Sequence, residues 1–580
     1  MSIPSRVGLP LASAADYVPR RPHDTVLYGI VREHLATFLA HTERTYAAPL
    51  PKYVVDAFEH YLACGDVAAG FLRCHCEGCG HDVLVAFSCK HRGLCPSCGT
   101  RRMCNEAVQL VDRVLPNVPV RQWVLSLPWE LRGLAAMKPG VVGAMDRIFA
   151  EEIARLTRRL AGIDGAQTGS IGCPQMFGGS LNLHVHFHTI AADGVFEKTE
   201  AAGVRFHEAP PSSKDDVAEV AQRVRDRAVR WLRRHGHLDE RAAEERSNEV
   251  PEPSALDGCM QLALAGGAFL ARPPASPNEG TDTDLERRER RFSATCDGFD
   301  VHCAVRIAAD DDVGRERLVR YCTRPPFALA RIEVLRDGRI AYLLKVPRKG
   351  RTHRVMTPIE FMARLAALIP RPRIPLVRYH GVFAPRSSWR PRVTPKPPAH
   401  AAKPKPCAAA ASASPAPAPA PASPTTASPP ASPTTASPPA ASPARAPLAG
   451  MAATAAAPAL APAVAPRGLT VAAVAVPPMV LVAPTMISIA HWGRLQEGAL
   501  FAWSSRLEWA VMMKRTWGFD VLACPRCAGR MRVISTITVP PVVRQILEHL
   551  GVRASPLPRA PARDPDGEQV DLGFEGFEAA

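Results

Sequence analysis

The sequence lacks an uninterrupted apolar run long enough to span a bilayer. Its most apolar stretch, LTVAAVAVPPMVLVAPTMISIA, is broken by Pro477, Pro478 and Pro484, and proline interrupts the helix that a membrane span requires. The N-terminal stretch MSIPSRVGLPLASAADYVPRR also lacks an apolar core of the length that a secretion signal needs. These absences argue against a membrane protein and against secretion, so we expect a cytoplasmic protein.

Acidic residues are comparatively few. The chain has 55 Asp and Glu against 71 Lys and Arg, which gives a formal net charge of +16 and a pI near 9.4. Such an excess favours a polyanionic partner, and nucleic acid is the commonest one. A generally arginine-rich composition, without any such partner, is the alternative explanation.

Disulfides are not expected among the 16 cysteines, because several form C-x2-C pairs and a secretion signal is lacking. In the stretch CHCEGCGHDVLVAFSCKHRGLCPSCGTRRM, one pair is Cys76 with Cys79 and the other is Cys95 with Cys98. Two such pairs at this separation can close one tetrahedral Zn²⁺ site of four thiolates. Cys89 lies between the pairs and is a further candidate ligand. A second ion or an exchange of ligands is also possible, because other candidate ligands are close, namely Cys64, Cys74, His75, His81 and His91.

A third pair, Cys524 with Cys527 in CPRCAGRMR, supplies only half of a metal site. It either shares ligands with another part of the chain or binds no metal. The role of the N-terminal module is open as well. Such modules are usually structural, whereas the Lys and Arg residues that flank this one would suit a finger that contacts DNA.

Composition divides the chain into six segments. A Pro-, Ala- and Ser-rich stretch with a near-perfect internal duplication begins around Thr394, and it has almost nothing that could form a core. The expected segments are an N-terminal helical segment (1–62), a zinc-binding domain (63–106), a main domain (107–394), a disordered linker (395–484), a C-terminal helix with a CxxC knuckle (485–555) and a disordered tail (556–580). Within the main domain, the polar stretch 208–292 is interpreted as an insertion or a lid rather than as core.

The main domain mixes strand and helix patterns. RQWVLSLP has strand character, KPGVVGAMDRIFAEEIARLTRRLAG has the apolar period of a long helix, and the glycines of GCPQMFGGS indicate a hairpin partner for the strand that follows. ARIEVLRDGRIAYLLKV is a hairpin by pattern, because alternating apolar residues flank Asp337 and Gly338. This order predicts an α+β fold with a largely antiparallel sheet and flanking helices.

Three histidines alternate in the stretch LNLHVHFHTIAADGVF. Alternation by two is the period of a strand, so His184, His186 and His188 should project from one face. Same-face neighbours lie about 6.6 Å apart, which lets two imidazoles share a divalent cation, whereas the outer two lie about 13 Å apart. The spacing leaves two candidate pairs, His184 with His186 and His186 with His188, beside the alternative of an ordinary histidine-rich strand.

Tyr321 is the candidate nucleophile, on the expected helix RERLVRYCTRPP. It is one of only 8 tyrosines, and Arg317, Arg320 and Arg324 lie four residues before it, directly before it and three residues after it. Such a cationic setting eases phenolate formation and can hold a phosphate, so the three arginines are candidate DNA contacts. A metal between two histidines would polarise the phosphodiester that a phenol attacks, although a helix tyrosine more often serves packing.

These motifs resemble, in the same order, those of rolling-circle transposases of the HUH (His-hydrophobic-His) superfamily, of the insertion-sequence-ninety-one type. The resemblance is carried by FSCKHRGLCPSCGTRRM, RQWVLSLP, LNLHVHFHTIAADGVF, RYCTRPPFALARIEVLRDGRIAYLLK, TPIEFMARLAALIPRPRIPLVRYHGVFAPRSSWRP and FDVLACPRCAGRMRVISTITVPPVVRQILEHLG. Together these segments cover most of 50–395 and 485–553.

The resemblance implies an HUH-type antiparallel sheet in which His186 and His188 hold a catalytic Mg²⁺ or Mn²⁺. It implies that Tyr321 attacks single-stranded DNA, leaving a 5′-phosphotyrosine link and a free 3′-hydroxyl. Zn²⁺ would be structural, and no nucleotide cofactor is expected, because the covalent link conserves energy. The expected partner is the single-stranded end of a DNA element, with no membrane and no small-molecule substrate, and the expected location is the nucleoid-associated cytoplasm.

Two departures and one gap qualify this resemblance. Some relatives carry two tyrosines one helical turn apart, but Arg317 occupies the second position here, so we expect the single-tyrosine form. Leu94 stands where many relatives have a histidine, which puts the zinc ligand set in doubt. The third ligand of the catalytic metal is not evident, and Gln175 and His184 are candidates.

Two other functions fit the same residues. A plasmid replication initiator or relaxase would use the same chemistry at a different DNA site. A zinc-dependent DNA-binding protein without catalysis would need the cysteines and the positive charge but not the histidine pair or the tyrosine.

Overall fold

The computed structural model describes residues 21–200, 203–238, 254–264, 268–270, 292–348, 351–396, 502 and 508–564. The chain divides into two compact units, one formed by Met1–Lys403 with Leu481–Ala580 and the other by Pro404–Val480, and every described residue belongs to the first unit. The expected linker, 395–484, lies outside the described residues except for its first two positions. Among the described helices, none has both the length and the apolar character that a bilayer crossing demands.

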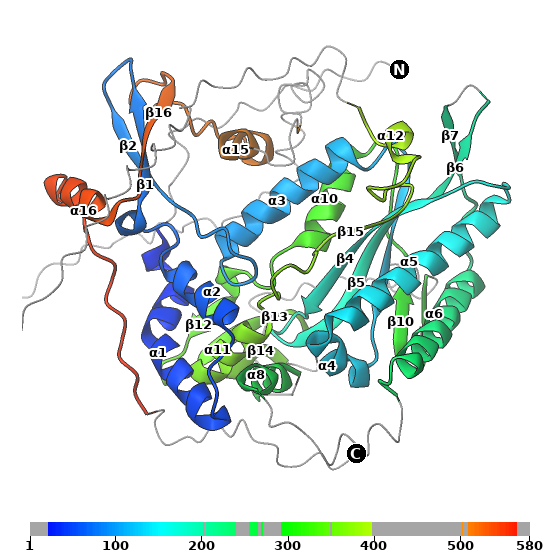
Figure 1. The fold of residues 1–580 in the computed structure, drawn as a ribbon, viewed down its shortest axis with the longest axis horizontal. Coiled ribbons are helices and arrows are strands. Elements are labelled where there is room, and N and C mark those ends of the chain that lie inside the picture. The colour runs from blue at the N-terminus through cyan, green and yellow to red at the C-terminus, as the bar shows by residue number, and fades with distance from the viewer. Residues whose placement is uncertain are drawn as a thin grey trace, which may run out of the picture. The chain divides into compact units, whose positions relative to one another are not determined.

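A seven-stranded antiparallel sheet forms the centre of the main domain (Figure 1). Its strands are, in spatial order, β15 (Arg378–Gly381), β4 (Gly169–Phe177), β5 (Leu183–Ala192), β3 (Val120–Ser126), β10 (Phe299–His302) and β9 (Ser293–Cys296), with β11 (Arg306–Ile307) also paired to β3. β4 and β5 are joined by a short turn, as the glycines before the histidine stretch predicted. The α+β class with a largely antiparallel sheet is confirmed, and β5 lies at the interior of the sheet.

Helices cover both faces of this sheet. The helices are α4 (Trp129–Met137), α5 (Pro139–Ala161) and α6 (Lys214–Arg234) on one face, and α3 (Pro96–Arg113) and α10 (Asp312–Thr323) on the other. α5 begins with Pro139 in its first turn and ends at Gly162, whose φ of 63° is left-handed, and both features are typical helix boundaries. α10 begins after Asp311, whose side chain accepts a hydrogen bond from the Gly314 amide.

The stretch 208–292 differs from the expected insertion or lid. α6 buries one face in the main core, because its apolar residues recur with helical period; these are Val217, Val220, Ala221, Val224, Ala228 and Leu232. α8 (Ala255–Leu264) lies in the same core. Both helices are therefore core elements, whereas residues 239–253, 265–267 and 271–291 of the stretch lie outside the described residues.

A second, four-stranded antiparallel sheet lies beside the first. It consists of β12 (Ile332–Val334), β13 (Ile340–Arg348), β14 (Arg351–Met356) and β8 (Ala268–Leu270), and it is covered by α11 (Pro358–Ala367), α8, α1 (Val26–Tyr46) and α2 (Lys52–Leu62). β12 and β13 pair across a turn in which Gly338 has a φ of 81°. Because this φ favours glycine, the turn forms where the Asp-Gly pair predicted it.

A small three-stranded sheet combines strands from two distant parts of the sequence. Its strands are β16 (Met531–Ile537), β1 (Phe71–Cys76) and β2 (Asp82–Ala86), and the nearby C-terminal helices are α15 (Trp509–Trp517) and α16 (Pro540–His549). Phe71 of β1 and Val543 of α16 bury their side chains in one cluster. The remaining elements are the hairpin of β6 (Gly194–Lys198) with β7 (Val204–Glu208) and the short α12 (Arg390–Val393).

The expected disordered tail, 556–580, is described as far as residue 564. This part of the tail runs along α1 and α2. The amide of Ala560 donates to the carbonyl of Arg32, and Arg559 forms an ion pair with Glu59. The tail is therefore packed over its first residues, and 565–580 lie outside the described part.

Candidate active site

The histidine stripe lies on β5, between β3 and β4. His186 stands opposite Ser126 on β3 and Gln175 on β4, and His188 stands opposite Val124 and Cys173. His186 and His188 share one face, as their alternation predicted, and both are buried, with 7% and 3% of their surface exposed. The face that carries them is the one covered by α3 and α10.

The imidazoles form a row along this face. Ring centroids lie 5.0 Å apart for His184 and His186 and 4.9 Å apart for His186 and His188. Nδ1 of His186 donates to the carbonyl of His184 at 2.9 Å. This hydrogen bond fixes the tautomer and leaves the Nε2 lone pair of His186 for another partner.

One buried atom of this row, Nε2 of His188, has no hydrogen-bond partner in the described part of the chain. The same is true of Oε1 of Gln175, which stands opposite His186. Nδ1 of His188 is 2.8 Å from the side-chain amide of Gln122. The amide nitrogen of Gln175 donates to the carbonyl of Cys322 at 2.7 Å, which directs its oxygen elsewhere. An unpaired imidazole nitrogen and an unpaired amide oxygen are costly to bury, and they are ligand types that a divalent cation accepts.

Burial lowers the pKa of both histidines. Desolvation lowers the pKa of His186 to about 4 and that of His188 to about 2, and the positive charge of Arg324 adds to the effect in both cases. Both imidazoles are therefore neutral near pH 7. Neutral imidazole is the form that binds a metal ion.

Tyr321 lies on α10 next to the histidine row. Its ring meets that of His188 edge to face, with 5.3 Å between centroids. Unlike the histidines, Tyr321 is 40% exposed. The backbone carbonyl of Tyr321 accepts a hydrogen bond from Gln175 at 3.3 Å, so the amide that lies between the histidines and α10 also contacts the helix backbone.

Two cations lie over the Tyr321 ring. The guanidinium carbon of Arg324 is 5.6 Å from the ring centroid, and Nζ of Lys345 on β13 is 5.1 Å from it. Arg324 also lies over the ring of Phe177 at 4.9 Å, and burial lowers its pKa. Lys345 escaped the sequence analysis, since it belongs to another strand and nothing in its local pattern pairs it with Tyr321.

The other two arginines that were expected to contact DNA, Arg317 and Arg320, differ in their burial. Arg317 is exposed, so it is available for contact with a ligand. Arg320 is 4% exposed and forms an ion pair with Glu316, one turn earlier on the same helix. Its expected role in DNA contact does not fit this position, because its charge faces a buried carboxylate.

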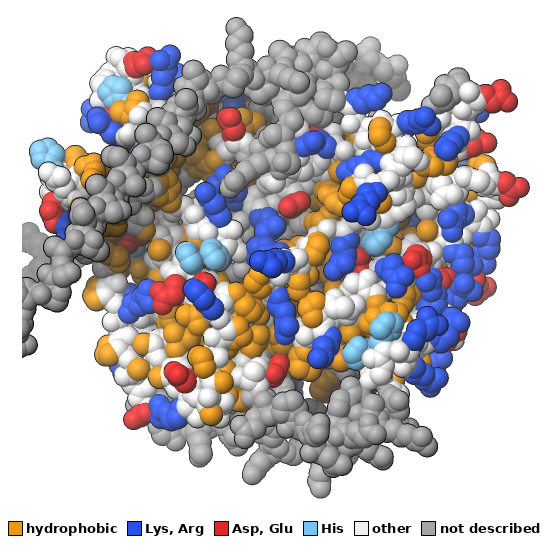
Figure 2. Space-filling model, viewed as in Figure 1, with side chains coloured by type: hydrophobic (Ala, Val, Ile, Leu, Met, Phe, Trp, Pro, Cys, Tyr) orange, Lys and Arg blue, Asp and Glu red, His pale blue; other side chains and the backbone are white. Residues whose placement is uncertain are grey.

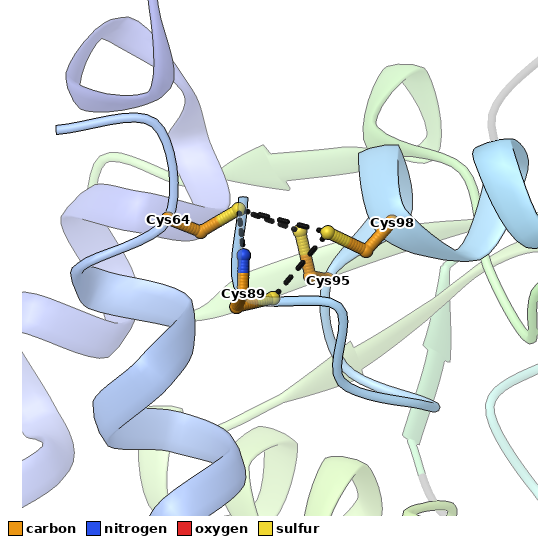
Figure 3. Close-up of side chains that lie close together, drawn as sticks. All are labelled: Cys64, Cys89, Cys95 and Cys98. Carbon is orange, nitrogen blue, oxygen red and sulfur yellow. Dashed lines mark hydrogen bonds between the residues drawn. The ribbon is translucent and has the colours of Figure 1, made fainter. Parts of the chain in front are cut away.

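The cysteines form two clusters of four, and neither is the set of Cys76, Cys79, Cys95 and Cys98 that the sequence suggested. One cluster consists of Cys64, Cys89, Cys95 and Cys98 (Figure 3), and its sulfur atoms lie 3.4 to 3.7 Å apart where they contact. Zn–S bonds of about 2.3 Å arranged as a tetrahedron separate the sulfurs by about 3.8 Å. The donor set and its spacing therefore fit a structural Zn²⁺. In this cluster Cys64 and Cys89 stand where Cys76 and Cys79 were expected.

The second cluster combines cysteines from two distant parts of the sequence. Sγ of Cys76 lies 3.5 Å from Sγ of Cys527, and Sγ of Cys79 lies 3.6 Å from Sγ of Cys524. The pair Cys76 and Cys79 is therefore not on one site with the pair of α3, as we had expected. The β1–β2 hairpin separates the two pairs and brings the first one to the knuckle before β16.

The first cluster lies beside the end of the helix that carries Tyr321. Cys95 is the N-cap of α3, and Cys98 belongs to its first turn. A Cβ placed on the next residue, Gly99, would lie 3.0 Å from Cβ of Pro325, shortly after α10 ends. The start of α3, which carries Cys98, therefore contacts the segment that directly follows the tyrosine helix.

Comparison with protein families adds to these observations. Residues 30–127 match the model of a transposase zinc-binding domain of the insertion-sequence-ninety-one type, and residues 169–390 match a family described as "Putative transposase". The zinc-binding domain precedes the transposase domain, as in transposases of this type. The chain belongs to the transposases of the insertion-sequence-ninety-one type. No curated protein and no solved structure matches it.

The two matches divide the transposase's candidate residues unequally. The zinc-domain match contains all four members of the first cluster but only Cys76 and Cys79 of the second. The second match contains the histidine row and Tyr321. As a transposase, the protein is a DNA-cleaving enzyme, and DNA is its partner.

Proposed function

We propose that this transposase cleaves and rejoins single-stranded DNA through a covalent link to Tyr321. The observation that carries the proposal is the contact between an exposed tyrosine ring and a buried histidine whose Nε2 has no hydrogen-bond partner among the described residues. A nucleophile and a metal ligand in this contact can act on one phosphodiester.

His186 and His188 would hold a Mg²⁺ or Mn²⁺, and Gln175 supplies the third protein ligand that the sequence left open between it and His184. The amide oxygen of Gln175 is buried without a hydrogen-bond partner in the described residues, and Gln175 stands opposite His186 on β4. When bound, the ion supplies polarisation of a non-bridging phosphate oxygen. Water or DNA oxygens would fill the coordination positions that these three residues leave open.

Tyr321 supplies the attacking oxygen. Its phenol oxygen forms a bond to phosphorus while the bond from phosphorus to the 3′-oxygen of the preceding nucleotide breaks. The phenolic proton is lost to solvent, and the leaving 3′-oxygen takes up a proton to become a free hydroxyl. Arg324 and Lys345 stabilise the phenolate and the phosphate by their positive charge. The reverse reaction, with a new 3′-hydroxyl, rejoins the strand.

Positive charge in other places need not serve DNA. Figure 2 shows Lys and Arg side chains across the visible face, many of them near acidic ones. Over α5 and α6 the arginines are engaged with carboxylates, as in the contacts of Arg155, Arg223 and Arg227 with Glu152. The cations around Tyr321 are therefore better candidates for phosphate contact than this network is.

The test is an adduct assay on the full-length protein. Wild-type transposase is incubated with a single-stranded oligonucleotide that carries the element end, in the presence of Mn²⁺ or Mg²⁺, and the modified residue is located by mass spectrometry. The expected result is one adduct, on Tyr321, that Tyr321→Phe abolishes while binding of the oligonucleotide persists. A wild-type protein that shifts the oligonucleotide in a gel but forms no adduct would favour a DNA-binding protein without catalysis.

A further inference from the structure

Arg515 of α15 lies buried between the helix of the first cysteine cluster and the helix of Tyr321. Its Nη1 and Nη2 donate to the two oxygens of Asp112 on α3, at 2.5 and 2.8 Å. Nη2 also lies 3.6 Å from Oε2 of Glu316 on α10. Only 3% of the arginine is exposed. Figure 1 shows α15, α3 and α10 as neighbours, although α15 follows the other two by more than a hundred residues.

The contacts of Arg515 are part of a buried chain of four charges. Asp112 pairs with Arg515, which pairs with Glu316, which pairs in turn with Arg320. The chain contains two positive and two negative groups, each at most 5% exposed. Removal of Arg515 would leave two buried carboxylates facing one arginine, and an uncompensated buried charge is strongly destabilising. Arg320, the last member, directly precedes Tyr321.

The second cysteine cluster holds α15 in place. Cys524 and Cys527 follow α15 closely and share their cluster with Cys76 and Cys79. Between α15 and the cluster, Lys514 pairs with Asp520, whose other oxygen accepts the amide of Leu522. Apolar contacts add to this attachment, because Met512 of α15 lies in a small core with Cys104 and Val108 of α3.

We propose that Arg515 is a positioning residue for Tyr321 and that a metal ion in the second cysteine cluster holds α15, and with it Arg515, in position. The C-terminal segment then contributes to the geometry of the active site, although neither family match contains it. Arg515 touches no reacting group. It fixes α10 against α3, and thereby fixes the approach of the Tyr321 ring to His188. The proposal rests on the proposed function, because its kinetic readout is the capture of DNA by Tyr321.

The first experiment compares Arg515→Gln with Arg544→Gln in the full-length protein. Arg544 is the matched control, because it is an arginine of the same C-terminal segment but lies exposed on α16. We expect Arg515→Gln to keep its zinc content and its affinity for the oligonucleotide, while the rate of adduct formation at saturating DNA falls about 10- to 100-fold, as for a slightly misplaced nucleophile. Arg544→Gln should keep the wild-type rate.

Two further variants separate positioning from a general loss of stability. Arg515→Lys keeps the charge without the two-pronged hydrogen bond, and it should give an intermediate rate. Asp112→Asn combined with Arg515→Gln removes the carboxylate charge that the single variant leaves without its arginine, so the double variant should be faster than Arg515→Gln alone. A double variant slower than both Arg515→Gln alone and Asp112→Asn alone would overturn the proposal, because general packing losses would then explain the effect.

Hydrogen exchange of the α10 backbone amides gives a readout that needs no chemistry. We expect Arg515→Gln to accelerate exchange in Asp312–Thr323, and Cys524→Ser with Cys527→Ser to do the same, whereas Arg544→Gln does not. If the wild type forms no adduct but α10 responds in this way, the proposed function fails and the coupling of the C-terminal segment to α10 stands. If the adduct forms and Arg515→Gln changes neither its rate nor the exchange of α10, the coupling is overturned and the proposed function stands.

Discussion

The sulfur atoms of Cys79 and Cys524 lie 3.6 Å apart although 445 residues separate the two positions. A contact of such long range is costly in chain entropy, and four thiols supply little packing in return. A bound metal ion offsets this cost, because its binding free energy becomes folding free energy. The same reasoning applies to the cluster of Cys64, although that cluster closes a much shorter loop.

The two clusters predict two zinc ions for each chain. We expect elemental analysis of the purified transposase to find two, and to find one after Cys64→Ser or after Cys524→Ser with Cys527→Ser. Cys296→Ser is the matched control, because Cys296 lies outside both clusters and its thiol donates a hydrogen bond to Oε1 of Gln222. Two zinc ions in the Cys524→Ser, Cys527→Ser variant would show that the second cluster is not a zinc site.

The histidine row predicts unequal effects of its members. His188→Ala should lower the rate of adduct formation at millimolar Mg²⁺ on the order of 100-fold, because it removes a metal ligand. His184→Ala should have a much smaller effect, because the carbonyl of His184, not its ring, holds His186. A larger loss in His184→Ala than in His188→Ala would move the metal pair by two residues along β5.

Gln175 predicts a change in metal dependence. We expect Gln175→Ala to raise the Mn²⁺ concentration for half-maximal adduct formation by about 10- to 100-fold, while adduct formation at saturating Mn²⁺ is largely restored. Gln167→Ala is the control, since that side chain contacts only the Gly165 carbonyl near the surface. An unchanged metal dependence in Gln175→Ala would leave the orphaned amide oxygen without a ligand role.

Lys345 predicts an effect on rate and on salt dependence. Lys345→Gln removes one of the two cations over the Tyr321 ring, so the adduct should form about 3- to 30-fold more slowly, which corresponds to a contribution of about 0.7 to 2 kcal/mol. If Lys345 also contacts a phosphate, the slope of log affinity against log salt should become shallower by about 1. Lys198→Gln, whose cation lies over Trp389, is the control, and equal rates for both variants would contradict the role of Lys345.

Glu152 predicts a dependence of stability on pH. Burial raises the pKa of this carboxyl, but hydrogen bonds from Arg227, Arg223 and Arg155 more than offset that effect and lower the pKa below its ordinary value. A depressed folded-state pKa gives stability that is present above the unfolded pKa, about 4.3, and is lost as pH falls through the folded pKa. Glu152→Gln should therefore lower the free energy of unfolding by about 2 to 4 kcal/mol at pH 7.

The measurement is thermal unfolding of wild type and Glu152→Gln between pH 7 and pH 3. The difference between the two proteins should shrink as the pH falls below the unfolded pKa of the carboxyl, because unfolding of the wild type is then coupled to its protonation. Other carboxylates titrate in both proteins, so their contributions cancel in the difference. A difference that is constant over this range would show that packing, and not charge, explains the loss.

Local pattern was sufficient for much of the fold and for one half of the site. Alternation by two placed His186 and His188 on one face, because side chains of a strand alternate regardless of what surrounds it. The turn at Gly338 followed from the need for a left-handed φ. Both features depend on a few neighbouring residues, and such features can be read from one sequence.

Features that depend on long-range pairing were not predictable in the same way. The spacing of Cys76, Cys79, Cys95 and Cys98 is compatible with one site or with two, and only the pairing of β1 with β16 decides between them. The buried position of Arg320 was the exception, because Glu316 lies one turn earlier and an i, i+4 ion pair of this kind gives a local signal. Recognition of the Glu316–Arg320 spacing in the sequence would have distinguished the paired Arg320 from the exposed Arg317 as a candidate DNA contact.

The order in which the ribosome makes the chain matters for the buried arginine of α15. The first cluster is complete once Cys98 has been synthesised, whereas the second waits for Cys527. Until then Asp112 has no Arg515 beside it, and β1 lacks the neighbour that β16 provides. A nascent chain that still ends within 397–501 therefore lacks the contacts of Arg515 with Asp112 and Glu316, so its competence to cut DNA should arise only after residues 515–527 have been synthesised.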